Sequence, residues 1–137
     1  MAFDSGDRML PLARRFKALS EDARLRILAL MFRHGELCGC EVEQLLGISQ
    51  SSASRHLRYL LNAGLVEDTR DGLWVYYRLA SPGDEEQRAF LEALRGLLAG
   101  VRIPDAGGDL ASMRAVRCHP AKARDPGEEC CPAEAGP

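Results

Sequence analysis

The chain has 137 residues and a formal net charge of −2, with 46% of its residues hydrophobic and 28% charged. These proportions are typical of one soluble globular domain, and the near-neutral charge excludes a protein that binds polyanions over its whole surface. No apolar run is long enough to span a bilayer, and the N-terminus lacks the pattern of a secretory signal, so we expect a cytoplasmic protein with no membrane partner.

Hydrophobic periodicity predicts two helices at the start of the chain. Residues 8–19 place apolar side chains one helical turn apart, with basic residues between them. Ser20 precedes two acidic residues, a pattern that predicts a helix N-cap followed by negative charge in the first turn. We therefore expect a second helix to begin after Ser20 and to end at Gly35.

Two shorter helices follow, joined by a turn that contains glycine. The first covers about residues 41–46 and ends at Gly47. The second covers residues 50–63, is capped by Ser49 and stops at Gly64, and its apolar residues share one face. Two helices connected in this way are typical of a helix-turn-helix.

The period of the sequence then changes from that of a helix to that of a strand. Residues 65–69 and 73–79 are rich in β-branched and aromatic residues, and residues 70–72 between them contain an Asp-Gly pair, a strong hairpin signal. A last amphipathic helix is expected over about residues 84–100, capped by Asp84 or by the serine three residues before it.

These elements predict a fold that is mainly α with a small β-hairpin, a winged helix-turn-helix. We expect residues 8–101 to form the DNA-binding and dimerisation domain. Periodicity fades from residue 102, where Pro, Gly and Ala dominate. Residues 102–137 are therefore expected to be a weakly ordered, cysteine-containing tail with one short helical turn around residues 109–117.

The second helix of the predicted helix-turn-helix has a polar face opposite its apolar face. Hydroxyl and amide side chains lie in its first turn and arginines follow, and a recognition helix enters the major groove with its N-terminus first. Arg78, beside the hairpin, is a further candidate for a phosphate contact. The residues that we expect to contact double-stranded operator DNA are Gln50, Ser51, Ser52, Ser54, Arg55, Arg58 and Arg70.

The charges are distributed unevenly although their sum is near zero. Residues 8–33 contain seven basic and two acidic side chains, whereas residues 84–92 contain four acids and one arginine. So few basic groups in one subunit favour a dimer on a two-fold symmetric DNA site. The first and last helices have larger apolar stripes than a small winged domain buries by itself, so we expect them to form the interface of a homodimer.

Two of the five cysteines, Cys38 and Cys40, lie two positions apart where the helix-turn-helix begins. A thiolate pair at this spacing can chelate one soft ion, because so short a loop closes at little entropic cost. The alternative is that one or both are small buried hydrophobic residues. Five unevenly spaced cysteines do not form the framework of a disulfide-stapled domain.

Residues 36–79 closely resemble the ArsR/SmtB family of metal-responsive repressors, and the resemblance extends over about residues 10–100. Its most specific parts are the segments ELCGC, SQSSASRHL, AGLV and GLWVYYRL. The resemblance implies a homodimeric winged-helix repressor that binds operator DNA and releases it when an inducer binds. In family members with thiols at ELCGC the inducer is trivalent arsenic or antimony, and the resemblance implies no organic cofactor.

The sequence departs from the family's usual arsenite pattern, C-x-C-x-x-C, because Glu43 stands where the third thiol is expected. A carboxylate is a poor ligand for As(III). No cysteine precedes Cys38, which disfavours the family's Cd(II) and Pb(II) site with an N-terminal thiol. No histidine lies in residues 84–100, which disfavours its zinc site on the last helix.

The missing sulfur has candidates in the tail, namely Cys118, Cys130 and Cys131. Three arrangements remain open. Cys38 and Cys40 recruit a tail thiol from the same or the partner subunit, or the three tail thiols form a separate triad. In the third arrangement, Cys38 and Cys40 by themselves bind a monomethylated arsenical, which needs two sulfurs.

Other functions were weighed against arsenic-responsive repression. A Cd/Pb-type or thiol-redox sensing repressor has the same fold. A thiol-dependent arsenate reductase needs an anion-binding loop beside a reactive cysteine, and Pro120 and Ala121 after Cys118 do not form one, so we expect no enzyme. A winged domain that binds only other proteins is the remaining alternative.

Overall fold

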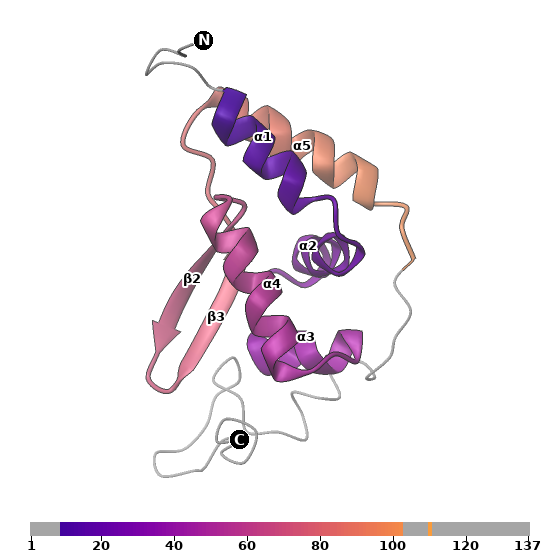
Figure 1. Ribbon diagram of the computed structural model, residues 1–137, viewed down its shortest axis with the longest axis vertical. Coiled ribbons are helices and arrows are strands. Elements are labelled where there is room, and N and C mark those ends of the chain that lie inside the picture. The colour runs from indigo at the N-terminus through magenta and orange to yellow at the C-terminus, as the bar shows by residue number, and fades with distance from the viewer. Residues whose placement is uncertain (1–8, 103–109, 111–137) are drawn as a thin grey trace.

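The computed structural model describes residues 9–102 and Leu110. Within that part of the chain, five helices and three strands follow one another in the order expected of a winged helix-turn-helix (Figure 1). The prediction of a mainly α fold with a small sheet is therefore confirmed. The elements are α1 (Met9–Ala18), α2 (Asp22–His34), β1 (Leu37–Cys38), α3 (Gly39–Leu46), α4 (Gln50–Asn62), β2 (Val66–Asp71), β3 (Trp74–Leu79) and α5 (Glu85–Leu98).

The start of α2 differs from the prediction. Glu21, not Ser20, occupies the N-cap position, and its side chain makes no capping hydrogen bond. The Ser20 hydroxyl instead donates to the carbonyl oxygen of Lys17 at 2.6 Å, so this serine completes the end of α1. A serine between two closely spaced helices can cap the start of the second helix or bond back to the end of the first. The sequence pattern did not distinguish these two roles. The predicted end of α2 at Gly35 is confirmed by its positive φ of 84°.

The caps of the two later helices agree with the prediction. The Ser52 amide donates to Ser49 Oγ at 3.2 Å, which fixes the start of α4. The Gln87 amide donates to Asp84 Oδ1 at 2.8 Å, which fixes the start of α5. Gly47 ends α3 in the left-handed region at φ 65°, and this turn directs the chain from α3 into α4.

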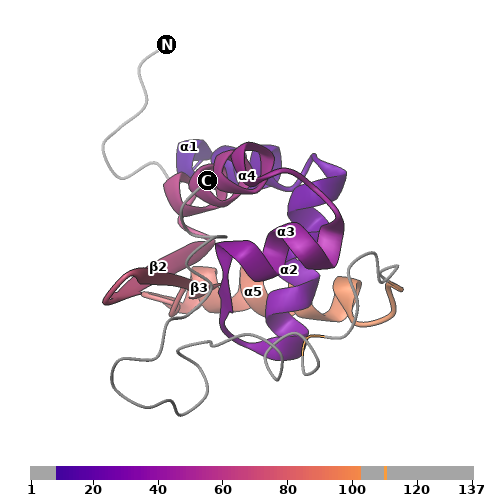
Figure 2. The ribbon, with the colours of Figure 1, turned by 90° about the horizontal axis from the view of Figure 1, so that it is seen from below.

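The hairpin turn lies one residue later than the predicted loop. Arg70 and Asp71 belong to β2 and pair with Val75 and Trp74, so the connection is the two-residue turn Gly72-Leu73. Gly72 has a φ of 65°, which suits a tight hairpin turn and is strained for other residues. The hairpin extends away from the helical part of the molecule in both ribbon views (Figures 1 and 2).

A third strand, which the sequence did not predict, joins the hairpin. β1 pairs antiparallel with β3, with Leu37 opposite Tyr77 and Cys38 opposite Tyr76, so the strand order is β1-β3-β2. Two residues are too few to show a strand period. The pairing matters for the site because it attaches Cys38 to the wing at the point where α3 begins.

The core lies around α2, which packs against α4 and α5. Ile27 and Leu28 of α2 and Leu57 and Leu60 of α4 are almost fully buried. Of the segment expected to contain a helical turn around residues 109–117, only Leu110 is described; it is helical and buried in this core. Within residues 9–102, no helix combines the length and apolar character needed to cross a bilayer.

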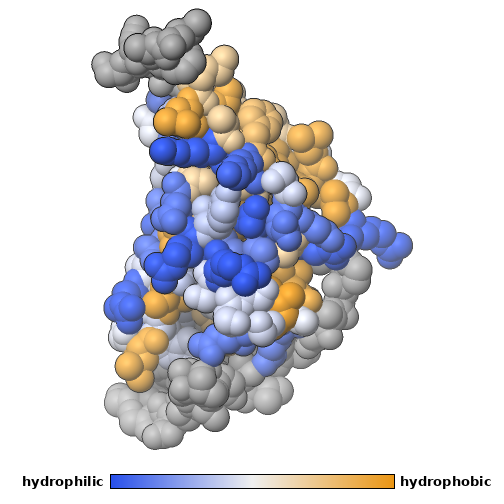
Figure 3. Space-filling view, in the orientation of Figure 1, coloured by the Kyte–Doolittle hydropathy of each residue, from blue (hydrophilic) through white to orange (hydrophobic). Residues whose placement is uncertain are grey.

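Apolar side chains remain exposed on α1 and α5. The two helices are in contact, since the Phe16 and Phe90 rings meet edge to face with centroids 5.5 Å apart. Figure 3 shows an apolar surface over these helices, in the orientation of Figure 1. Its exposed members include Met9, Leu10, Phe16 and Leu97, at 59–75% relative exposure.

Candidate functional site

The exposed face of α4 is polar and partly cationic. Ala53, His56, Leu57 and Leu60 turn inward and are buried. The structure brings most of the predicted DNA-contacting residues together on the opposite face, whereas Ser52 is half-buried. The exposed members are Gln50, Ser51, Ser54, Arg55 and Arg58.

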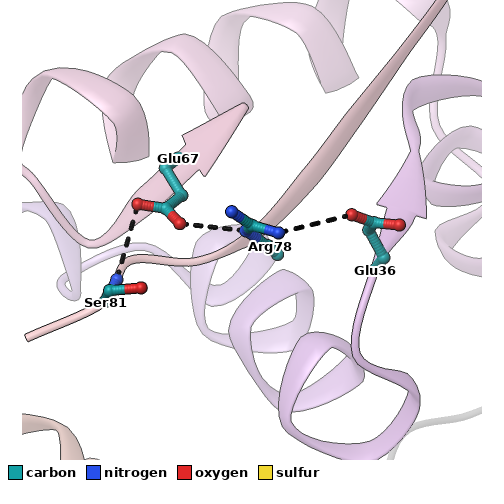
Figure 4. A network of polar contacts seen from close by, with 4 residues as sticks. All are labelled: Glu36, Glu67, Arg78 and Ser81. Carbon is teal, nitrogen blue, oxygen red and sulfur yellow. Dashed lines mark hydrogen bonds and ion pairs between the residues drawn. The ribbon is translucent and has the colours of Figure 1, made fainter. Parts of the chain in front are cut away.

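The wing carries two exposed arginines, one of which forms ion pairs. Arg70, which we predicted to contact DNA, is exposed on β2. Arg78 on β3 donates from Nε to Glu67 Oε1 at 2.9 Å, and its Nη1 lies 3.9 Å from Glu36 Oε2 (Figure 4). The Ser81 amide donates to the other Glu67 oxygen at 3.5 Å. Arg78 therefore ties the base of the wing to the segment before β1, while its side chain remains 51% exposed.

The hydrogen bond from Arg78 holds the pKa of the Glu67 carboxyl below its ordinary value, and the Ser81 amide acts in the same direction. The carboxylate of Glu67 is thus charged at neutral pH. Because Glu36 lies on the far side of Arg78, this one cation faces two carboxylates from different segments. The network fixes the wing relative to the residues that lead into α3.

A buried arginine supports α4 from behind. Arg24 of α2 donates from Nε to the Ala18 carbonyl oxygen at 2.7 Å, and its guanidinium carbon lies 4.1 Å from the centroid of the Tyr59 ring. Arg24 Nη1 is 3.4 Å from Nδ1 of His56. Burial lowers the pKa of His56, and the charges of Arg24 and Arg55 lower it further. His56 is therefore a neutral packing residue of α4.

The two predicted thiols lie side by side where β1 meets α3. The Sγ atoms of Cys38 and Cys40 are 2.9 Å apart and are not joined by a disulfide. Cys38 is the N-cap of α3, and its side chain accepts a hydrogen bond from the Glu41 amide. The Glu41 carboxylate accepts in return from the Cys38 amide at 3.0 Å. Cys38 thus combines a strand end, a helix cap and one half of a thiol pair.

The contact with Cys40 raises the pKa of the Cys38 thiol well above its ordinary value, and burial raises it further. The charges of Cys40 and Glu41 also raise this pKa, while the hydrogen bond that the Glu41 backbone amide donates to the Cys38 sulfur lowers it. Without a bound ion the Cys38 sulfur therefore remains protonated at neutral pH. A thiophilic ion has to displace a thiol proton to bind there.

The thiols open onto a pocket of about 210 Å³ between α3, α4 and the wing. Sequence reasoning missed the wing side of this pocket, because its residues follow the thiols by more than thirty positions and meet them only through the β1–β3 pairing. The lining comprises Cys38, Cys40 and Glu43 with Gly39 at the start of α3, Gln50, Ala53, Ser54 and Leu57 of α4, and Leu73, Trp74, Val75 and Tyr77 of the wing.

The described residues contain two of the five candidate sulfur ligands. Glu43 lines the same pocket as Cys38 and Cys40. Even so, within residues 9–102 and Leu110 no group of three Cys, His, Asp or Glu side chains is arranged to hold a metal ion. The other predicted ligands lie outside the described residues; they are Cys118, Cys130 and Cys131.

Comparison with known sequences places the chain among regulators. Residues 21–68 match the family model for bacterial regulatory proteins of the arsR family. The chain is 52% identical over 64 residues to the arsenic resistance transcriptional regulator ArsR1 of Pseudomonas putida, a match that covers 47% of this chain and 50% of the relative. It is 35% identical over 102 residues to the arsenical resistance operon repressor of Escherichia coli, covering 69% of this chain and 87% of the relative.

A relative named for another metal is also similar. The cadmium resistance regulatory protein CadC homolog of Staphylococcus aureus is 39% identical over 83 residues, covering 61% of this chain and 66% of that protein. The chain thus spans between half and two thirds of the length of the Pseudomonas and Staphylococcus relatives that it matches.

Solved structures share the fold. HlyU from Vibrio cholerae superposes with a TM-score of 0.57 at 32% identity, covering 67% of this chain and 96% of that one. The homodimeric winged helix-turn-helix DNA-binding domain Mb0332 from Mycobacterium bovis has a TM-score of 0.57 at 35% identity, covering 72% of this chain and 90% of that one.

Proposed function

The chain belongs to the arsR family of bacterial regulatory proteins, and from this premise we propose that it represses transcription as a homodimer that releases operator DNA when trivalent arsenic or antimony binds its cysteines. In this proposal residues 8–101 bind DNA and dimerise. The tail, residues 102–137, contains the three further thiols that are candidates to complete the inducer site or to form a separate one. The observation that carries the proposal is the 2.9 Å approach of the two sulfurs at the N-cap of α3.

The DNA-binding part rests on the exposed face of α4. Its first turn presents Gln50, Ser51 and Ser54, which have the hydrogen-bonding groups that read base edges. Arg55 and Arg58 follow on the same face, and guanidinium groups bind phosphate oxygens. Arg70 extends this cationic surface onto the wing, so base-reading and phosphate-binding groups lie in the order that a winged helix-turn-helix requires.

The dimer rests on the apolar surface over α1 and α5. Side chains such as Leu97, at 75% relative exposure, are not covered by any of residues 9–102 or by Leu110. A second copy of the chain would bury them in a two-fold interface. The homodimeric Mycobacterium bovis domain supports a homodimer for a chain of this fold.

Release follows from the position of Cys38. An arsenic atom bound to both sulfurs pulls the Cys38 side chain away from the Glu41 amide that it caps. Loss of a Ser, Thr, Asn or Asp N-cap costs about 0.5–2 kcal/mol, and a sulfur cap, being a weaker acceptor, falls at the low end of this range. Cys38 also pairs with Tyr76 in the wing, so the same movement disturbs both α3 and the wing. These are the two elements that precede and follow α4 in the chain.

The test is a gel-shift titration with arsenite. Cys38→Ser and Cys40→Ser are expected to bind the operator as tightly as the unmodified protein but to remain bound when arsenite is added. The triple variant C118S/C130S/C131S is the matched control, because it keeps the thiol pair and removes the tail sulfurs. Release from a C38S/C40S double variant would refute the assignment of these two ligands.

The control variant also decides among the open ligand sets. Normal release by C118S/C130S/C131S means that two sulfurs suffice, whereas a weaker response means that the tail completes the site. Cadmium is titrated in parallel because one relative is a cadmium resistance regulator. Release by cadmium but not by arsenite would favour the Cd/Pb-type alternative.

A further inference from the structure

We propose that the pocket between α1 and the C-terminal end of α4 binds backbone phosphates of operator DNA next to the base pairs that α4 reads. The pocket has a volume of about 420 Å³ and is lined by Arg14, Lys17, Tyr59, Asn62 and Ala63. This inference rests on the proposed function, because it extends the same DNA-binding surface. It assigns a DNA contact to α1, the helix whose apolar side belongs to the proposed dimer interface.

The exposed side of α4 leads directly into this pocket. Four exposed residues at helical spacing share that side, and they are Ser51, Arg55, Arg58 and Asn62. Asn62 lies about 6 Å beyond Arg58 along the helix axis. A recognition helix enters the major groove with its N-terminus, so the opposite end of α4 lies toward the edge of the groove, where the phosphates run.

Two cations of α1 face the pocket, and a third is turned away from it. Arg15 is buried, and its Nη1 lies 3.7 Å from Glu86 Oε1 of α5. Arg14 and Lys17 are exposed, lie one helical turn apart and line the pocket. Neither α1 nor α4 contains an acidic residue, and among the described residues no acid lines the pocket. The pocket is therefore cationic.

A buried arginine of α2 holds the two walls of the pocket together. Arg24 Nε donates to the Ala18 carbonyl oxygen at 2.7 Å, and its Nη2 lies 3.5 Å from the Lys17 carbonyl oxygen, so this side chain holds the end of α1. The same guanidinium lies over the Tyr59 ring of α4, with its carbon 4.1 Å from the centroid. The backbone that carries the cations of α1 is thus fixed beside α4.

The lining has the groups that bind phosphodiester oxygens. A guanidinium and an ammonium group supply positive charge, and the Tyr59 hydroxyl and the Asn62 amide supply neutral donors. Phosphate contacts position a protein on the duplex and carry no sequence information directly. The pocket therefore adds affinity and register to the contacts of α4 without changing its sequence preference.

Continuity with α4 favours a DNA backbone over a free anion. Arg58 and Asn62 lie on one side of the helix, so a strand that contacts Arg58 passes the mouth of the pocket. Both ribbon views place α1 beside α4 (Figures 1 and 2). Inorganic phosphate has the same chemistry as the DNA backbone, and the experiment separates these two sources.

The experiment measures the salt dependence of DNA binding by the full-length protein and its R14Q/K17Q variant. Loss of two phosphate contacts should lower the slope of log affinity against log salt by about 1.8 for each subunit. Between about 50 and 200 mM salt, the variant should therefore lose about 12-fold less affinity per subunit than the unmodified protein does. A duplex of unrelated sequence should show the same difference, because phosphates are common to all sequences.

Two matched variants separate the pocket from the net charge. R26Q/R33Q removes the same charge from α2, where Arg26 Nε lies 2.7 Å from Asp22 Oδ1 and Arg33 donates to the Val101 carbonyl oxygen at 3.3 Å. It should keep the slope of the unmodified protein. R14K/K17R retains two cations in the pocket and should also keep that slope, since both side chains bind phosphate.

Ethylation interference on the operator locates the contacts with the unmodified protein itself. Ethylation of the phosphates next to those bound by α4 should weaken binding of the unmodified protein and should have little effect on R14Q/K17Q. Inorganic phosphate is titrated in parallel and followed by the NMR shift of the Asn62 side-chain amide. Phosphate binding with an unchanged DNA salt slope would make the occupant a free anion and overturn the DNA contact.

The remaining outcomes distinguish this inference from the proposed function. The pocket assignment is wrong if interference ends at the phosphates of α4, or if R26Q/R33Q lowers the slope as much as R14Q/K17Q does. In both cases the proposed function stands as long as the unmodified protein binds the operator and arsenite releases it. If the unmodified protein does not bind operator DNA, the proposed function itself fails.

Discussion

Cys38 has a structural task that Cys40 lacks, and separate substitutions of the two residues test it. The Cys38 side chain caps α3 at the Glu41 amide and is 2% exposed, packed in one cluster with Trp74. Cys40 lies inside the first turn of α3 and is partly exposed. Both are proposed arsenic ligands, so a difference in stability between their variants reports the cap and the packing alone.

The magnitude follows from these two contributions. Cys38→Ala removes the cap, which for the weak acceptor sulfur costs about 0.5 kcal/mol, the low end of the range for oxygen caps, and leaves a small void, at roughly 1 kcal/mol more. We expect its free energy of unfolding to fall by about 1.5 kcal/mol, which corresponds to roughly 8 °C in Tm for a domain of this size. Cys40→Ala should cost less than about 1 kcal/mol. Cys38→Ser should recover most of the loss, because serine is a favoured N-cap.

Urea unfolding followed by circular dichroism and Trp74 fluorescence measures these differences. All variants are compared at one protein concentration, because dissociation of a dimer makes its apparent stability depend on concentration. If Cys38→Ala is no less stable than Cys40→Ala, the capping argument is wrong. The same conclusion follows if Cys38→Ser is as unstable as Cys38→Ala.

Three further predictions concern DNA binding, assembly and pH. Arg58→Ala should weaken DNA binding on all sequences and lower the slope of its salt dependence by about 1, whereas Gln50→Ala should mainly change the sequence preference. A gel shift titrated with salt measures both effects. Equal slopes for Arg58→Ala and the unmodified protein would contradict the phosphate role of Arg58. Leu97→Asp, at a residue 75% exposed, should produce folded monomers in analytical ultracentrifugation, and an intact dimer would exclude this part of the surface from the interface. Burial lowers the pKa of His56 in the folded state, the charges of Arg24 and Arg55 lower it further, and the charge of Glu21 opposes them. The unfolded chain therefore takes up a proton at a higher pH than the folded chain does. Stability should fall as the pH drops below about 6.5. His56→Gln should flatten this fall in Tm, and an unchanged pH profile would mean that His56 does not titrate in this way.

The elements that the sequence predicted best are those whose signals are local. α4 has a serine cap, an apolar face and a glycine stop within sixteen residues, and the structure reproduces its start at Gln50. The hairpin was recognisable from its β-branched and aromatic residues. Its turn was misplaced by one residue, because the Asp-Gly signal does not specify which residues pair, and Asp71 pairs with Trp74.

The parts that the sequence did not predict depend on distant contacts. β1 exists because Leu37 and Cys38 pair with residues of β3 almost forty positions later. The pocket follows from that pairing, since it brings Trp74 and Tyr77 beside the thiols. The ion pairs of Arg78 show the same limit, because the acids that engage it, Glu67 and Glu36, come from separate segments.

Under the proposed function, the location of the thiols accounts for the control of a DNA complex by one small ligand. A useful inducer changes DNA affinity by 5–150-fold, which corresponds to a coupling of about 1–3 kcal/mol. In the proposed function, loss of the Cys38 cap in each subunit contributes to this coupling only to the extent that the DNA-bound state depends on the cap more than the free state does. The core around Leu28 and Leu57, both of which are almost fully buried, does not have to rearrange. Placing the ligand at the N-cap, where α3 and the wing meet, lets binding act on the elements that position α4 while the rest of the fold stays intact.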